Sequence, residues 1–100
     1  MPNTLRKRYG HRYGRFPAIA RLENSVKIMV YALDPTHGPH VHVAYEGAER
    51  NAARLRIDDG RTIDNRARIK PKDLRAARAW LSHNRGVARA AWDRINPRRR

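Results

Sequence analysis

The sequence contains no cysteine, so disulfide bonds and cysteine-ligated zinc sites are excluded. It also has no apolar run that approaches the roughly 18 residues a membrane-spanning helix needs. The basic N-terminus is not followed by the apolar segment that a secretory signal would carry. Together these absences predict a cytoplasmic protein that does not enter a membrane.

Acidic residues are also scarce. The chain has nine Asp and Glu against 23 Lys and Arg, which leaves a formal net charge of +14. A chain with this excess is attracted to polyanions. We therefore expect RNA or DNA as its partner, or alternatively an acidic protein. The plainer alternative is an arginine-rich composition whose charges simply face solvent.

The length of 100 residues suits a single domain over 1–100. Residues 1–16 form a basic arm in which Arg-Tyr-Gly occurs twice, and residues 97–100 form a short basic tail. Arginine interleaved with aromatic residues suits stacking on bases and pairing with phosphates. The residues expected to contact nucleic acid, in this arm and in a later helix, are Arg6, Lys7, Arg8, Arg12, Arg15, Arg75 and Arg78.

Alternation of apolar and polar residues predicts strands over 18–22, 26–33, 38–45 and 52–58, with a return strand over 61–65. The dipeptide Asp59-Gly60 favours a tight turn before the return strand. In the stretch "GPHVHVAY", residues 38–45, the apolar side chains should face the core. His40 and His42 should then face outward or into a groove.

The C-terminal third has helical periodicity. Pro71 suits a first helical position, and Asp73 is favourable near a helix N-terminus. Asn84 is a suitable N-cap for a second helix. The side expected to be buried in that helix comprises Val87, Ala88, Ala91, Trp92 and Ile95. The predicted fold class is therefore α+β, an antiparallel β-sheet of three to five strands packed by a C-terminal helical hairpin.

The pair His40 and His42 has two chemical interpretations. One is metal binding, for which His37, Asp34 and His83 are the further candidate ligands. The other is metal-independent acid–base catalysis on RNA, in which one imidazole accepts a proton and the other donates one.

In the catalytic version, the 2′-hydroxyl attacks the adjacent phosphate and leaves a cyclic phosphate. Arg54 or Arg56 would clamp that phosphate with its guanidinium. His40, His42, Arg54 and Arg56 are then the candidate catalytic residues. No cofactor and no metal is expected in this version.

Two further interpretations require no chemistry. The histidines can be structural, with His40 hydrogen-bonded to a nearby backbone group and His42 packed beside a tyrosine. They can also belong to a surface that binds RNA or a partner protein. We favour the structural role for the pair itself, and all four interpretations remain open at this point.

The order of "VKIMVY", Asp34, "GPHVHV", "LRAARAWLSHN" and "AWDRIN" resembles the DUF4160 family of small bacterial proteins, a domain of unknown function. The resemblance covers most of the chain, although the family usually has a shorter N-terminus. His40 and His42 match its signature histidines. The resemblance implies no settled activity, but its members are often encoded beside another small domain, as toxin–antitoxin pairs are.

The expected function is therefore a toxin–antitoxin-type component that engages RNA or DNA, with endoribonuclease activity as its catalytic version. The alternative is a non-catalytic binding module for nucleic acid or for an acidic partner, the cognate toxin or antitoxin. In that version the histidines are part of the scaffold.

Overall fold

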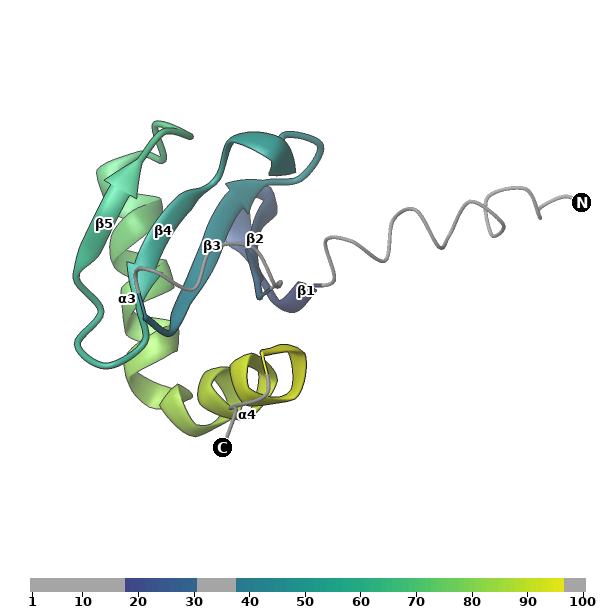
Figure 1. The fold of residues 1–100 in the computed structure, drawn as a ribbon. Coiled ribbons are helices and arrows are strands. Elements are labelled where there is room, and N and C mark those ends of the chain that lie inside the picture. The colour runs from purple at the N-terminus through teal and green to yellow at the C-terminus, as the bar shows by residue number, and fades with distance from the viewer. Residues whose placement is uncertain (1–17, 31–37, 97–100) are drawn as a thin grey trace, which may run out of the picture.

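Within residues 18–30 and 38–96, the computed structural model contains five strands and two helices (Figure 1). The structure describes residues 18–30 and 38–96, so the predicted arm, the basic tail and the end of the strand predicted over 26–33 lie outside the described residues. The elements are β1 (Ala18–Leu22), β2 (Val26–Met29), β3 (His40–Tyr45), β4 (Ala53–Arg56), β5 (Thr62–Asn65), α3 (Pro71–His83) and α4 (Arg85–Ile95). Two short 3-10 turns, η1 (Glu23–Ser25) and η3 (Glu49–Asn51), precede β2 and β4.

The strands lie side by side in chain order, β1-β2-β3-β4-β5, and every neighbouring pair is antiparallel. This arrangement confirms the predicted α+β class with an antiparallel sheet and two C-terminal helices. Among the described residues, none of the helices has the length and apolar character needed to cross a bilayer.

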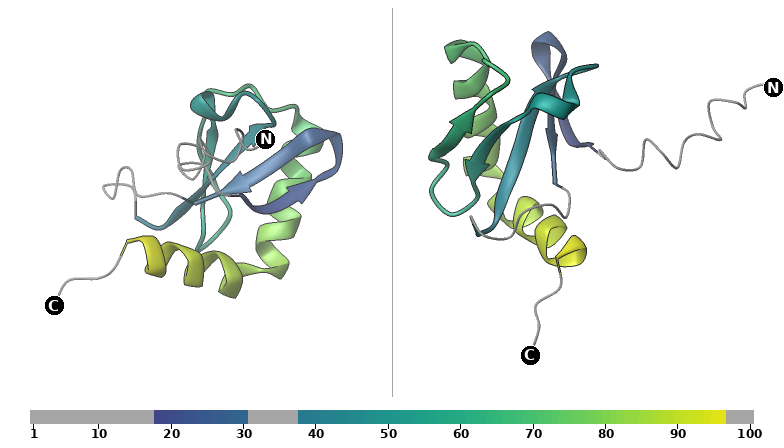
Figure 2. Two further views of the ribbon diagram at one scale, coloured as in Figure 1. Left: turned by 90° about the vertical axis from the view of Figure 1, so that its right-hand side faces the viewer. Right: turned by 45° about the horizontal axis from the view of Figure 1, so that its top comes forward.

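Both helices pack on one face of the sheet and meet at Asn84 in an L, with α3 running along the strands and α4 across one end of the sheet (Figure 2). The core between them is aliphatic apart from one tryptophan. Its buried members from strands and the connecting loop are Val26, Ile28, Val30, Val41, Val43, Ala53, Leu55, Ile57 and Ile69. Those from the helices are Leu74, Ala77, Leu81, Ala88, Ala91 and Trp92.

A network of polar side chains fixes the start of α3 on the sheet. Asp73 accepts a hydrogen bond from the Tyr45 hydroxyl at 2.7 Å and another from the Asn24 amide at 2.9 Å. The Tyr45 hydroxyl also accepts from the backbone amide of Lys70 at 3.1 Å. The first turn of α3 is thereby tied to β3 and to the β1–β2 turn.

Two details of the predicted helices are wrong. Asn84 forms no side-chain cap on α4; its amide instead donates to the carbonyl of Trp80 at 2.9 Å, so it closes the end of α3. Val87 is 53% exposed rather than buried. It lies about 100° around the helix from Ala88, which is the centre of the buried stripe, so it falls outside that stripe.

Asp59-Gly60 lies in the turn between β4 and β5, as predicted, and Gly60 has φ +76°. A side chain at Gly60 would meet no atom within 4 Å, and the same holds for Gly86 in α4. The two glycines therefore differ in backbone conformation and not in available space.

We predict opposite stability changes for the same substitution at these two sites. Gly60→Ala should lower the free energy of unfolding by about 1–2 kcal/mol, because L residues are strained at positive φ. Gly86→Ala should raise it by about 0.5 kcal/mol, because alanine restricts the unfolded chain and fits a helix. Urea unfolding of both variants checks this, and changes of equal sign would contradict the turn geometry.

Candidate functional site

The sheet register places the predicted site residues in two neighbouring rows across the strands. His42 lies opposite Met29 on β2 and opposite Arg54 on β4, and Arg54 lies opposite Asp64 on β5. His40 lies opposite Arg56 in the same way. Because side chains alternate along a strand, His40 and His42 project to the face away from α3. The structure thus brings together the four residues predicted for catalysis.

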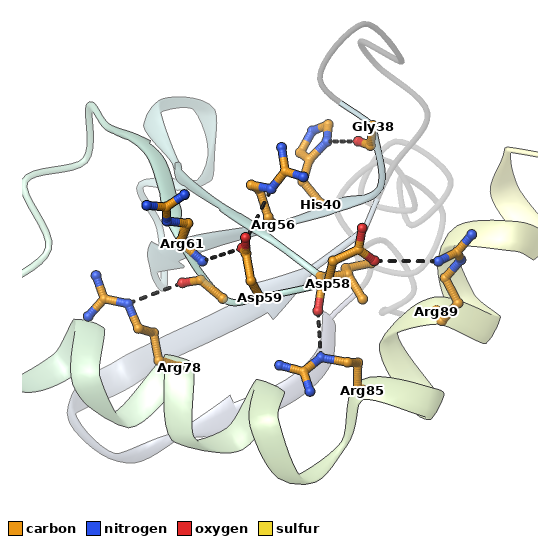
Figure 3. Close-up of polar contacts among 11 residues, drawn as sticks. Gly38, His40, Arg56, Asp58, Asp59, Arg61, Arg78, Arg85 and Arg89 are labelled. Atoms are coloured by element: carbon orange, nitrogen blue, oxygen red, sulfur yellow. Dashed lines mark hydrogen bonds and ion pairs between the residues drawn. The ribbon is translucent and has the colours of Figure 1, made fainter.

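His40 is fully buried, at 0% exposure. Its Nδ1 lies 2.7 Å from the carbonyl oxygen of Gly38 (Figure 3). Since a carbonyl can only accept, Nδ1 carries the proton in this contact. The ring also packs against His42, with 4.9 Å between centroids, and against Trp92 of α4, at 5.1 Å. His40 therefore connects the strand, the Gly38 loop and α4.

His42 is 4% exposed. The pKa of this imidazole is lowered to about 3. Burial is the largest cause; the neighbouring His40 and Arg54 also lower the pKa, and Asp64 raises it by a smaller amount. The ring is consequently neutral at physiological pH. A neutral imidazole of such low basicity is a poor general base and does not carry the proton that a general acid must donate.

Arg54 is committed to Asp64. Its Nε donates to a carboxylate oxygen of Asp64 at 3.0 Å, and its Nη2 donates to the same oxygen. Arg56 is more exposed and its Nε lies 3.5 Å from Asp59. The carboxylate of Asp64 therefore already compensates the charge of the Arg54 guanidinium.

The expectation that both histidines face outward or into a groove is wrong, because neither side chain is exposed. They lie on the sheet face opposite Val41 and Val43, as alternation predicts, but both are buried. Their neighbours on that face, Met29, Ala44 and Ala52, form a second small apolar cluster. This environment favours the structural interpretation of the pair, and the ribonuclease interpretation stays a prediction.

The metal interpretation gains no support from the described part of the chain. Within residues 18–30 and 38–96, no three His, Cys, Asp or Glu side chains converge in a way that could hold a metal ion. His83 is on α3 and its Nδ1 contacts the Ala79 carbonyl of its own helix at 2.8 Å. His37 and Asp34 lie outside the described residues.

The residues predicted to bind nucleic acid are in different situations. Arg75 is exposed on α3. Arg78 is partly buried and holds the β4–β5 turn, with its Nε donating to Gly60 O at 3.1 Å and its Nη2 to Thr62 Oγ1 at 2.7 Å. Arg6, Lys7, Arg8, Arg12 and Arg15 lie outside the described residues.

Four exposed cations of the structure are not among the residues that the sequence predicted to bind nucleic acid. They precede Arg75 in the chain and are Arg66, Arg68, Lys70 and Lys72. A signal was available in the sequence, because residues 66–75 hold five basic residues and one acidic residue. That the acidic residue, Asp73, turns inward could not be read from local sequence.

The low pKa of His42 predicts acid-sensitive stability. The unfolded chain binds a proton at His42 below about pH 6.5, whereas the folded chain does not until about pH 3. The stability contribution is therefore complete above pH 6.5 and is lost as the pH falls, with a slope of about 1.4 kcal/mol per pH unit.

Urea unfolding between about pH 6.5 and 4.5 measures this slope in a range where most carboxylates stay ionised. His42→Gln should flatten the dependence, and NMR of the wild-type ring should show it neutral throughout the range. A wild-type stability that does not change with pH there would contradict the buried, neutral state of His42.

Comparison with known proteins finds one matching family model. The family model described as "Domain of unknown function (DUF4160)" matches residues 26–93, which include β2 to β5, α3 and most of α4. No match was found among curated proteins or among solved structures. Since the match spans more than half of the sequence and includes the histidine strand, the chain belongs to the DUF4160 family.

Proposed function

We propose that this protein is a non-catalytic module that binds nucleic acid through its phosphate backbone. The observation that supports this best is the surface at the β5–α3 connection. We call it the β5–α3 basic surface, and it comprises Arg66, Arg68, Lys70, Lys72 and Arg75. All five side chains are exposed, and within the described part of the chain none forms an ion pair.

The acidic residue within this segment has its carboxylate directed inward. Asp73 is buried, and its carboxylate accepts from Tyr45 and Asn24. These two hydrogen bonds, with the charges of Lys72 and Lys70, hold the pKa of Asp73 below its usual value, so the carboxylate stays ionised and bonded inward. Its hydrogen-bond partners thus keep it turned away from an anion bound outside.

The rest of the charge distribution supports the same function. The N-terminal arm adds five basic residues and the tail adds three, with no acidic residue in either segment. The N-terminus of α3 contributes a favourable dipole to the same surface. Neutralising several phosphates releases counterions, so such binding should weaken steeply with salt.

Binding without cleavage accords better with the histidine strand than ribonuclease activity does. A phosphate that is being cleaved must reach both imidazoles, and both are buried. The toxin–antitoxin role remains part of the proposal as an association with a small acidic partner protein. Such a partner would compete with nucleic acid for the same basic surface.

The proposal predicts a salt-dependent affinity that this surface supplies. Binding of the full chain to a labelled RNA and to a labelled DNA duplex would be measured across a salt series. The logarithm of the association constant should fall linearly with the logarithm of salt, by about 0.9 per phosphate neutralised on a duplex. Arg66→Gln/Arg75→Gln should lower this slope by up to about 2, one for each lost phosphate contact.

Arg50→Gln/Arg94→Gln is the matched control, because it removes two exposed arginines elsewhere. Equal losses in both double variants would mean that net charge alone matters, and a slope near zero in the wild type would exclude phosphate binding. The RNA recovered from the assay should be intact. Cleavage that His42→Gln abolishes would overturn the non-catalytic assignment.

A further inference from the structure

The β4–β5 turn is surrounded by arginines from four parts of the chain. Figure 3 shows Arg56 at the end of β4, Arg61 after the turn, Arg78 on α3, and Arg85 and Arg89 on α4, all near residues 57–60. The Arg61 guanidinium points away from the turn. The turn itself contributes two carboxylates, Asp58 and Asp59. Four of these arginines contact residues 57–60 through their guanidinium groups, whereas Arg61 does so through its backbone amide.

The two carboxylates pair with two of these five arginines. Asp58 lies 3.7 Å from Arg89 Nη1. Asp59 lies 3.5 Å from Arg56 Nε and accepts from the backbone amide of Arg61 at 2.9 Å. The side chain of Arg61 takes no part in that contact.

The remaining three arginines, which we call the turn arginines, are Arg61, Arg78 and Arg85. Arg85 Nε donates to the carbonyl of Ile57 at 2.7 Å, and Arg78 Nε donates to that of Gly60 at 3.1 Å. These acceptors are neutral, so each hydrogen bond fixes a guanidinium without cancelling its charge. Within the described residues, the turn arginines have no carboxylate partner.

This combination of fixed position and uncompensated charge is what an anion site needs. A guanidinium has five N–H donors, and the contacts above use one from Arg85 and two from Arg78. The other donors remain to bind a phosphate in a bidentate manner. Because both side chains are already held, they lose less conformational freedom on binding than a mobile lysine does.

We propose that the turn arginines form a second anion site, which binds phosphate groups of the same nucleic acid that the β5–α3 basic surface binds. The inference rests on the proposed function and extends its footprint. Lys72, Arg75 and Arg78 follow one another at intervals of three residues on α3, about 4.5 Å of helix rise apart. They connect the two sites along one flank of the helix, which suits a continuous phosphate backbone better than a single small anion.

NMR titration of the full chain with a short DNA duplex tests this placement. The side-chain Nε–H signals of Arg78 and Arg85 and the amide signals of Gly60 and Arg61 report on the turn, and the amides of residues 66–75 report on the β5–α3 basic surface. We expect both sets to shift with the same saturation. Shifts in 66–75 alone would overturn the second site and leave the proposed function intact.

The opposite results separate the two proposals. Shifts at the turn without shifts in 66–75 would support the second site and refute the β5–α3 basic surface. No shift in either region at saturating duplex would refute both.

Arg61→Gln provides an independent test, because within residues 18–30 and 38–96 Arg61 holds the turn only through its backbone amide. The variant should retain the thermal stability of the wild type and lower the salt slope of duplex binding by about one, as loss of one phosphate contact does. Arg94→Gln, an exposed arginine near the end of α4, is the matched control and should change the slope less. Equal effects of the two substitutions would contradict a specific site at the turn.

Discussion

The central strand β3 is buried on both faces, and most of the structure depends on this constraint. Five consecutive residues, from His40 to Ala44, are buried. One face carries Val41 and Val43 against the helices, and the other carries the two imidazoles. A histidine without access to water stays neutral unless a carboxylate compensates its charge. Burial therefore favours a structural role for the pair over acid–base chemistry.

Much of the fold could be predicted from the sequence, because it depends on local patterns. Period-two alternation located the strands, and Asp59-Gly60 located the turn before β5. Pro71 marked the start of α3. The same alternation placed His40 and His42 together on one face. It could not show whether that face was exposed, because exposure depends on what packs against it.

The candidate site was less predictable for the same reason. Arg78 has the appearance of a surface cation in a basic helix flank, yet it donates to Gly60 and Thr62, residues more than a dozen positions earlier. Asp73 has the appearance of an ordinary acid at a helix start, yet it binds Tyr45 and Asn24. Asn84 was expected to cap the helix that follows it, whereas its amide reaches the helix before it. The partners of Arg78 and Asp73 are brought close because α3 docks on the sheet, whereas the Asn84 contact is local to the end of α3.

The chain-order arrangement of the strands has a consequence for how the protein folds. Every strand pairs with the strand that precedes it, so the sheet can grow by successive hairpins with little loop-closure entropy. The contacts that join distant parts of the chain are made when the helices dock, such as Asn24 with Asp73 and His40 with Trp92. The sheet can therefore assemble early, while completion of the buried histidine environment has to wait for the last helix of the chain.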